Sequence, residues 1–567
     1  MSVLPLVTRY ADAEHAKSHP TQTALAALDL EPIEGGERYR VIVPEQANIA
    51  ADTAGVQARG ARANEVAVRF DSGQPGSPYR DITFAELDAA SSKLAVLLQG
   101  LGVAAKTVVA VHTGSRIETV ITHLAIYKLG AIAATLSQLY GPETVAHVLN
   151  DSGATVMVTQ DTVWRPISDA VRAAFPALRH VLVVGQAASH EIAFTRIDSQ
   201  DVQNFVPVVT HRDDPALLVY TSGSTGQPKG VLHAHRILHG YKPTLELFFN
   251  LELRDPELVL WTAADWAWVG GLIDIVYPAL LFGHRLIATQ HRFEAEWALD
   301  FMQQHGVTHI LLTPTALNRL AQVQGPRERW PDLKLRVIFT GGEPLSSETL
   351  RWLHEELGVI CNEGYGMSEV NHMIGNCQAI KPIRPGSMGW EFPGHVAALV
   401  DEQGVPVADG EVGEIVTVAD TPTLFLGYWN QPELTAAMRL GNWVRTRDLA
   451  VRDAKGYYWY RGRNDDLIKS AGYRIGPVEI EDVLMRHPAV VEVAVIGVPD
   501  VERGQVVCAC VALAGSTVGS EELTAELRDH VRAALGPYKT PRIVKYFDDL
   551  PHTTTGKVSR AQLRKLA

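Results

Sequence analysis

The segment from Tyr220 to Gly230, YTSGSTGQPKG, constrains the fold and chemistry of this chain more than any other stretch. It places three glycines, four serine or threonine side chains and one lysine within eleven residues. Glycine lets backbone N–H groups approach an anion closely, and hydroxyl and ammonium groups donate to phosphate oxygens. Apolar residues flank the segment at 216–219 and 231–232. We therefore predict two strands joined by a tight loop that binds a polyphosphate, that of ATP, rather than a polar surface linker.

The composition is that of a soluble enzyme with more than one hydrophobic core. The chain has 567 residues, 46% apolar and 20% charged, and its net charge of −13 does not favour nucleic-acid binding. Its four cysteines show neither metal-ligand spacing nor a disulfide framework, and the first residues show no signal-peptide pattern, so we expect a cytoplasmic protein. The most apolar stretch, 268–282, carries Asp274 and Pro278 and is too short to span a bilayer. We expect it to be buried core, with no membrane span.

Helical and strand patterns alternate from Ile82 onward. Residues 83–100 have helical spacing with Thr83 as N-cap, followed by strand 107–112, helix 117–129 and strand 131–136. Further strands are expected at 155–158, 180–184, 337–340 and 359–362, the last two running into glycine-containing loops. This order predicts an α/β fold: a large N-terminal domain with mainly parallel sheets covered by helices.

The last hundred residues form a different pattern. A helix start at 480–485, strands at 490–498 and 505–513, and a helix at 520–535 predict a small α+β domain. A charged, turn-prone segment at 463–466 marks the boundary. We therefore divide the chain into a large domain, 1–464, and a small mobile C-terminal domain, 465–567.

The phosphate loop resembles the signature of the adenylate-forming synthetases, the family of acyl-CoA synthetases, luciferases and peptide-synthetase adenylation domains. Other motifs of this family follow in the correct order as far as Lys557. The resemblance implies that ATP is bound by Thr221, Ser222, Gly223, Ser224, Thr225, Gly226, Lys229, Gly342, Glu343, Pro344, Glu363, Gly364, Tyr365, Gly366, Met367, Asp448, Arg463 and Arg474.

Individual roles follow from the same resemblance. The ring of Tyr365 would lie on adenine, Ser368 would hold the α-phosphate, and Glu369 would supply an oxygen ligand to Mg²⁺. Asp448 would accept hydrogen bonds from both ribose hydroxyls. The guanidinium groups of Arg463 and Arg474 would lie near ribose and phosphate, where a permanent charge suits the ligand.

The resemblance places further functional residues in the small domain. Lys557, in the segment TTTGKVSR, matches the catalytic lysine that bridges the carboxylate and the α-phosphate as charge shifts in the transition state. Asp465 matches the hinge about which the small domain turns. The segment SAGY, with Gly472, would line the pantetheine tunnel, and Arg532 resembles an arginine that contacts CoA phosphate.

The segment DWAWVGG aligns with the wall of the acyl pocket in this family. The predicted pocket residues are Trp268, Val269, Gly270, Gly341 and Gly366. Acetate-specific relatives have tryptophan at the position of Gly366 and larger residues at the other two glycines. Each buried methylene adds roughly 0.8 kcal/mol, so an open pocket would favour acids longer than acetate, or a ring.

We interpret the chain as an acyl-CoA synthetase of the short- to medium-chain branch, with ATP, Mg²⁺ and coenzyme A as cofactor or substrates. A carboxylic acid and ATP would give acyl-adenylate and pyrophosphate, and CoA would then give acyl-CoA and AMP. Three alternatives stay open: a ligase for aromatic acids, an adenylation enzyme that loads a separate carrier protein, and a nucleotide-binding protein without catalysis. The sequence leaves the oligomeric state open, a homodimer included.

Overall fold

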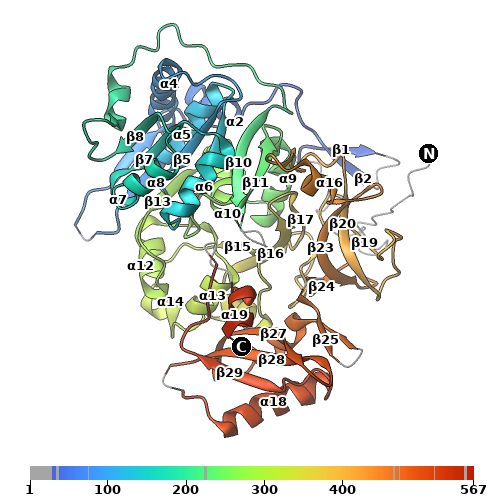
Figure 1. Ribbon diagram of the computed structural model, residues 1–567. Coiled ribbons are helices and arrows are strands. Elements are labelled where there is room, and N and C mark those ends of the chain that lie inside the picture. Colours follow the sequence, from blue (N-terminus) through green and yellow to red (C-terminus); the bar gives the residue numbers. More distant parts are fainter. Residues whose placement is uncertain are drawn as a thin grey trace.

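The computed structural model describes residues 28–33, 38–74, 76–221, 227–463, 466–470, 473–515, 517–553 and 558–566. Two large sheets and a smaller antiparallel sheet precede a separate C-terminal unit, drawn in red at the bottom of Figure 1. A short hairpin, β1 (Leu30–Ile33) and β2 (Arg38–Val41), comes before them. The mixed sheets covered by helices confirm the predicted fold class.

The first large sheet carries the predicted phosphate loop at one side. Its strands, in spatial order, are β21 (Gly427–Tyr428), β11 (Lys229–Ala234), β10 (Pro215–Thr221), β6 (Ile132–Thr135), β5 (Val108–His112), β7 (Val156–Gln160), β8 (His180–Val184) and β9 (Ile192–Ala193). Pairing is parallel from β10 to β9 and antiparallel between β10 and β11. Thr221 pairs with Lys229, which confirms the two predicted strands on either side of the loop.

The second large sheet carries the two predicted glycine motifs. Its strands, in spatial order, are β18 (Trp390–Glu391), β17 (Asn371–Gly375), β16 (Ile360–Met367), β15 (Val337–Gly341), β14 (His309–Leu311), β12 (Val259–Thr262), β13 (Arg285–Thr289), β3 (Val66–Asp71) and β4 (Arg80–Thr83). The predicted end of a strand at residue 362 is wrong, because β16 continues to Met367 and pairs antiparallel with β17. The glycines at 364 and 366 make this possible, since they let neighbouring groups approach the strand closely.

Helices bury the faces of these sheets. Helix α4 (Phe84–Gly100) begins with a capping box between Thr83 and Glu86, and α5 (Ile117–Lys128) is buried along its whole length. The others are α2 (Ile49–Asp52), α3 (Ala54–Arg59), α6 (Pro142–Ser152), α7 (Asp161–Trp164), α8 (Ser168–Ala174), α9 (Ile237–Phe248), α10 (Val269–Gly271), α11 (Tyr277–Phe282), α12 (Ala295–His305), α13 (Pro314–Leu320), α14 (Pro326–Arg329), α15 (Ser347–Trp352) and α16 (Pro432–Ala436). Residues 271–280 are buried, as predicted for core. Among the described residues, none of the helices has the length and apolar character that crossing a membrane requires.

The smaller sheet follows in the chain and brings Asp448 to the nucleotide motifs. It contains β19 (Ala398–Val400), β20 (Val412–Val418), β23 (Trp443–Arg452), β22 (Arg439–Leu440) and β24 (Tyr458–Arg463), all antiparallel.

The C-terminal unit has its own sheet and its own buried clusters. Its elements are β25 (Ile468–Ser470), β26 (Tyr473–Ile475), α17 (Pro477–Leu484), β27 (Val490–Asp500), β28 (Gly504–Leu513), α18 (Glu521–Leu535), β29 (Ile543–Phe547) and α19 (Arg560–Leu566). The helices and strands predicted here are present, with Ser520 as the N-cap of α18, but the helix expected to start at 480–485 begins earlier, at Pro477. The domain boundary at 464/465 stays a prediction, because both residues lie outside the described part of the chain.

Candidate active site

Two predicted adenine segments lie side by side at the carboxyl ends of β15 and β16. Gly341 pairs with Gly364 in parallel register, so Gly342, with φ +87°, begins its turn beside the second motif. The Glu343 carboxylate accepts a hydrogen bond from Thr315 at 2.8 Å. The Glu363 carboxyl is buried and accepts the N–H of Leu345, and burial raises its pKa to about 8. Glu363 therefore carries a proton at neutral pH and adds no negative charge beside a nucleotide.

Tyr365 and Asp448 are in direct contact. The Tyr365 hydroxyl donates to Oδ2 of Asp448 at 2.8 Å, and Tyr460 donates to Oδ1 at 3.0 Å. Asp448 lies on β23 opposite Arg463 on β24. The two tyrosines fix the orientation of the carboxylate.

Lys229 and Glu369 meet through a residue that the sequence did not single out. Nζ of Lys229 donates to the Tyr428 hydroxyl at 2.8 Å, and that hydroxyl donates to Oε1 of Glu369 at 2.5 Å. Tyr428 comes from the short edge strand β21, which pairs with β11 beside the phosphate loop. An aromatic residue in an otherwise ordinary segment gives no signal of this role, so sequence reasoning missed it.

Two arginines lie near enough to Lys229 to affect its pKa. Burial lowers the pKa of the Lys229 ammonium, Glu369 opposes this, and Arg463 and Arg447 add to the lowering through their charges. Arg447 was also missed. Its φ is +65° and its N–H donates to Glu414, and its position directly before Asp448 was an available signal. Three cations near enough to act on one another suit a bound polyphosphate.

The donor set around Glu369 fits Mg²⁺. Its carboxylate is a hard oxygen ligand, it is buried, and it lies beside Lys229 at the start of β11. The neighbouring Ser368 is held by its carbonyl oxygen, which accepts from Nε2 of His233 at 2.7 Å. This bond joins β11 to the Ser368–Glu369 motif.

Part of the predicted site lies outside the described residues. These residues are Ser222, Gly223, Ser224, Thr225, Gly226, Asp465, Gly472 and Lys557, together with the side chain of Arg474. Their roles stay predictions.

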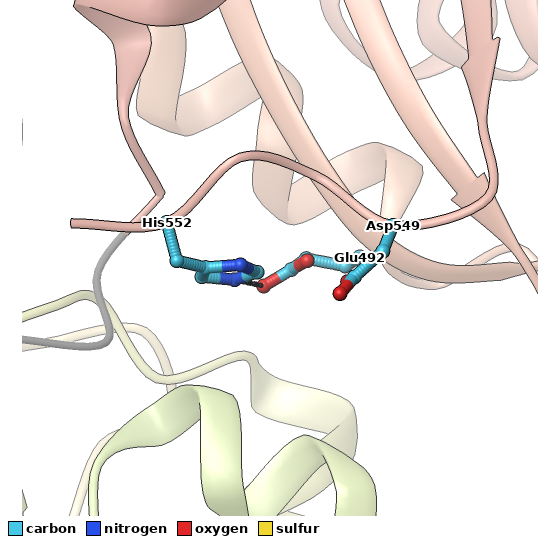
Figure 2. Close-up of side chains that lie close together, drawn as sticks. All are labelled: Glu492, Asp549 and His552. Atoms are coloured by element: carbon cyan, nitrogen blue, oxygen red, sulfur yellow. Dashed lines mark hydrogen bonds and ion pairs between the residues drawn. The ribbon is translucent and has the colours of Figure 1, made fainter. Parts of the chain in front are cut away.

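His552, five residues before Lys557, lies in the described part of the chain. His552 donates to Glu492 across the small domain at 3.0 Å, and Figure 2 shows the imidazole and the two carboxylates of Glu492 and Asp549 close together. The hydrogen bond to Glu492 raises the pKa of His552, and the charges of Asp549 and Glu343 act in the same direction. Glu343 belongs to the large domain. His552 therefore lies on the side of the small domain that faces the adenine segments.

Arg532 lies elsewhere. It is an exposed residue of α18, 3.5 Å from Asp529, and Figure 1 shows α18 on the side of the small domain opposite the large one. The structure does not bring Arg532 to the nucleotide residues.

The three predicted pocket glycines differ from one another. A Cβ at Gly366 would lie 2.0 Å from the carbonyl oxygen of Asn371, and one at Gly341 would lie 2.5 Å from that of Gly364. At Gly270 the nearest atom would be a Leu311 methyl at an ordinary 3.7 Å. The expectation that all three glycines leave open space is therefore wrong for the first two, which are required by closely packed backbone. Trp268 and Val269 are partly buried beside Gly270.

The comparisons with known proteins cover the same two parts of the chain. Residues 56–429 match the model of the AMP-binding enzyme family, and residues 479–557 match the AMP-binding enzyme C-terminal domain. A human protein named acyl-coenzyme A synthetase ACSM4, mitochondrial, is 33% identical over 97% of this chain and 95% of its own length. An uncharacterized acyl-CoA ligase of Bacillus subtilis, YtcI, is 31% identical over 85% and 90%.

A solved structure shares the fold. The anthranilate CoA ligase AuaEII, crystallised with anthranoyl-AMP, superposes with a TM-score of 0.83 at 28% identity, over 92% of this chain and 98% of its own. With both family models matched in order and full-length relatives above 30% identity, the chain belongs to the AMP-binding enzyme family, the adenylate-forming acyl-CoA synthetases.

Proposed function

We propose that this AMP-forming acyl-CoA ligase activates a carboxylic acid larger than acetate, in the short- to medium-chain range, and transfers it to coenzyme A. One observation carries the proposal: Lys229, Tyr428 and Glu369 form a single hydrogen-bonded cluster, and Tyr365 of the same motif contacts Asp448. Residues more than 200 positions apart are thus gathered where phosphate, metal, adenine and ribose would each find a matching group.

In the first step a carboxylate oxygen attacks the α-phosphorus of ATP. The bond to the bridging oxygen of the β-phosphate breaks, and pyrophosphate leaves with an acyl-adenylate left behind. Lys229, Arg447 and Arg463 would offset the phosphate charge, and Ser368 would orient the α-phosphate. A Mg²⁺ ion held by Glu369 would neutralise further negative charge. Lys557 would bridge the two reacting anions.

In the second step the sulfur of CoA attacks the acyl carbon. The carbon–oxygen bond to phosphate breaks, AMP leaves, and the thiol proton passes to solvent. We propose that the small domain, 465–567, turns about Asp465 between the steps, withdrawing Lys557 and bringing Gly472 toward the thiol. Arg532, on the outer face of the small domain in the present orientation, would approach CoA only after such a turn.

The size of the acid is supported by Gly270, where a side chain would meet only ordinary contacts. An aromatic acid is the second candidate, since the structural neighbour AuaEII is named for anthranilate. Loading of a carrier protein is the third.

The test is a panel of acids from two to ten carbons with benzoate and phenylacetate, assayed for pyrophosphate with ATP alone and for AMP with ATP and free CoA. CoA-dependent AMP release with acids of four or more carbons supports the proposal. Adenylation without turnover on free CoA would instead favour a carrier protein, and silence across the panel would overturn the function.

A further inference from the structure

Three chain segments around Lys229 are hydrogen-bonded to one helix, α6. Two of its residues, His147 and Asp151, make these contacts. They are separated by one helical turn, so both side chains lie on the same face of the helix. Both are partly buried, whereas Asn150 is exposed. Neither His147 nor Asp151 belongs to the motifs assigned to the nucleotide.

His147 contacts the residue directly before Lys229. Its Nε2 lies 2.9 Å from the carbonyl oxygen of Pro228. A carbonyl oxygen can only accept, so Nε2 carries the ring proton and donates it to this bond. Proline has no N–H, which makes the carbonyl the one backbone group of Pro228 that can form a hydrogen bond. The contact therefore holds the backbone where the chain leaves the predicted loop and Lys229 begins β11.

The side chain of Asp151 contacts the strand on the other side of the loop. The Tyr220 hydroxyl donates to Oδ2 of Asp151 at 2.7 Å. Tyr220 is buried, and it directly precedes Thr221, the last residue of β10 and the partner of Lys229 in the sheet. Helix α6 thus holds both ends of the predicted phosphate loop.

The backbone of Asp151 contacts a third segment, which follows β21. Its carbonyl oxygen accepts from Nε1 of Trp429 at 3.0 Å and from Nδ2 of Asn430 at 2.9 Å. Trp429 directly follows Tyr428, whose hydroxyl accepts from Nζ of Lys229. The hydroxyl partner of the lysine is therefore held by the same helix as the backbone of the lysine.

This double attachment matters because a lysine side chain is long and flexible. Its ammonium group can meet a phosphate in many orientations, and each that is lost on binding costs entropy. A backbone and a hydroxyl partner that are already fixed reduce this cost, so they strengthen the contact with the ligand.

We infer that His147 and Asp151 are positioning residues, which hold Lys229 in place for the phosphates of ATP that leave as pyrophosphate. The inference rests on the proposed contact between Lys229 and these phosphates, and it gives α6 a role in the first half-reaction alone. AMP lacks both of these phosphates, so its binding does not depend on α6.

The test measures the binding of ATP and of AMP to the full chain by calorimetry, with Mg²⁺ and without a carboxylic acid. In His147→Ala the Kd of ATP should rise about 3–10-fold, the worth of one hydrogen bond, while the Kd of AMP stays within about twofold of the wild type. His147→Gln keeps a donor near the position of Nε2 and should bind ATP within about twofold of the wild type. Asn150→Ala, at an exposed residue of the same helix, is the matched control and should bind both nucleotides as the wild type does.

Asp151→Ala and Tyr220→Phe remove the same hydrogen bond from its two ends. Each should raise the Kd of ATP about 3–10-fold, and the double variant should lie within about twofold of the weaker single variant, because both changes act on one contact. Fully additive losses would overturn the assignment of Asp151.

Kinetics separate positioning from a general loss of structure. In His147→Ala kcat/KM for ATP should fall about 3–10-fold in pyrophosphate release. Supplied acyl-adenylate should still react with CoA at the wild-type rate, since pyrophosphate has no part in that step. Equal losses in both half-reactions would overturn the inference.

Tyr220→Phe removes a single oxygen atom and decides the question if His147→Ala fails to fold. An ATP affinity unchanged in the folded variants overturns the inference and leaves the proposed function in place. Equal weakening of ATP and AMP also overturns it, because α6 would then support the whole nucleotide site. If the wild type binds ATP but releases no pyrophosphate with any acid, the proposed function fails, and the two Kd values still decide the role of α6.

Discussion

Nζ of Lys229 and Oε1 of Glu369 lie 3.7 Å apart and share the hydroxyl group of Tyr428 between them. The hydroxyl accepts from the ammonium and donates to the carboxylate, so it bridges the two members of this ion pair. It thereby orients the carboxylate that is proposed to bind Mg²⁺.

The first prediction removes this hydroxyl. In Tyr428→Phe the Lys229 ammonium is free to move onto Glu369, where it competes with the metal ion. We expect adenylation to fall about 10-fold, the worth of a charge-assisted hydrogen bond, and the Mg²⁺ concentration for half-maximal rate to rise. Pyrophosphate release measured against Mg²⁺ checks this, with Tyr79→Phe at the exposed Tyr79 as control. A Mg²⁺ titration unchanged from wild type would contradict the orienting role.

The second prediction separates the two kinds of pocket glycine. A methyl group at Gly366 would lie 2.0 Å from the Asn371 carbonyl, so Gly366→Ala must force β16 and β17 apart. We expect a loss of about 1–3 kcal/mol in the free energy of unfolding, measured by urea denaturation. Gly270→Ala meets only ordinary contacts in a helical turn and should leave that free energy unchanged or raise it by up to about 1 kcal/mol. Equal losses in both variants would show that the packing difference is not real.

Substitution at Gly270 should also change which acids the enzyme accepts. Gly270→Leu would project a side chain toward Asp274 and Leu311, so the acids accepted should become shorter. The ratio of kcat/KM for octanoate to that for butanoate should fall by about 10-fold or more, since several methylenes lose their burial. A ratio equal to that of the wild type would mean that the acyl chain does not pass Gly270.

Whether an element of the fold could be predicted from the sequence depends on how far apart in the chain the residues that determine it lie. Helix α4 was predictable because Thr83 and Glu86 form a local capping box, and the phosphate hairpin because apolar residues bracket its glycines. Local signals fail where a distant strand decides the structure. Residues 363–367 were expected in a loop, but pairing with β17 extends the strand through both glycines.

The site shows the same division. The motifs containing Lys229, Glu369 and Asp448 could be found because each has a recognisable neighbourhood. Tyr428 could not, because its role arises only from the pairing of β21 with β11. Nor could the hydrogen bond between His147 and Pro228, which are 81 residues apart.

The third prediction concerns pH. The pKa of His552 is raised, first by its hydrogen bond to Glu492 and further by the charges of Asp549 and Glu343. Because the pKa is raised, the stabilisation that protonated His552 gains from these carboxylates is fully present below the unfolded pKa of 6.5. It is lost as the pH rises through the folded pKa. Because Glu343 belongs to the large domain, we expect the ratio of adenylation to thioesterification to fall as the pH rises above about 6.5.

A substitution at His552 tests whether this histidine causes the pH dependence of the ratio. His552→Gln keeps a hydrogen-bond donor but cannot become positively charged. Its ratio of adenylation to thioesterification should therefore vary less with pH than that of the wild type between pH 6 and 8.5. His190→Gln, at an exposed histidine, should follow the wild-type curve. Identical profiles for wild type and His552→Gln would rule out His552 as the titrating group.

The last prediction divides the two half-reactions. Lys557 would stabilise charge only where the carboxylate meets the α-phosphate, so Lys557→Ala should slow adenylation on the order of 10²–10³-fold, the usual cost of losing one transition-state donor. Supplied acyl-adenylate should still react with CoA at the wild-type rate, because the small domain would by then have turned and withdrawn the lysine. Lys565→Ala, eight residues later on α19, offers a matched control with the same change of charge. Both half-reactions are measured separately, as pyrophosphate release and as AMP release from the synthetic adenylate. Equal losses in the two would mean that Lys557 stays at the site throughout, and the proposed turn about Asp465 would then have no role in catalysis.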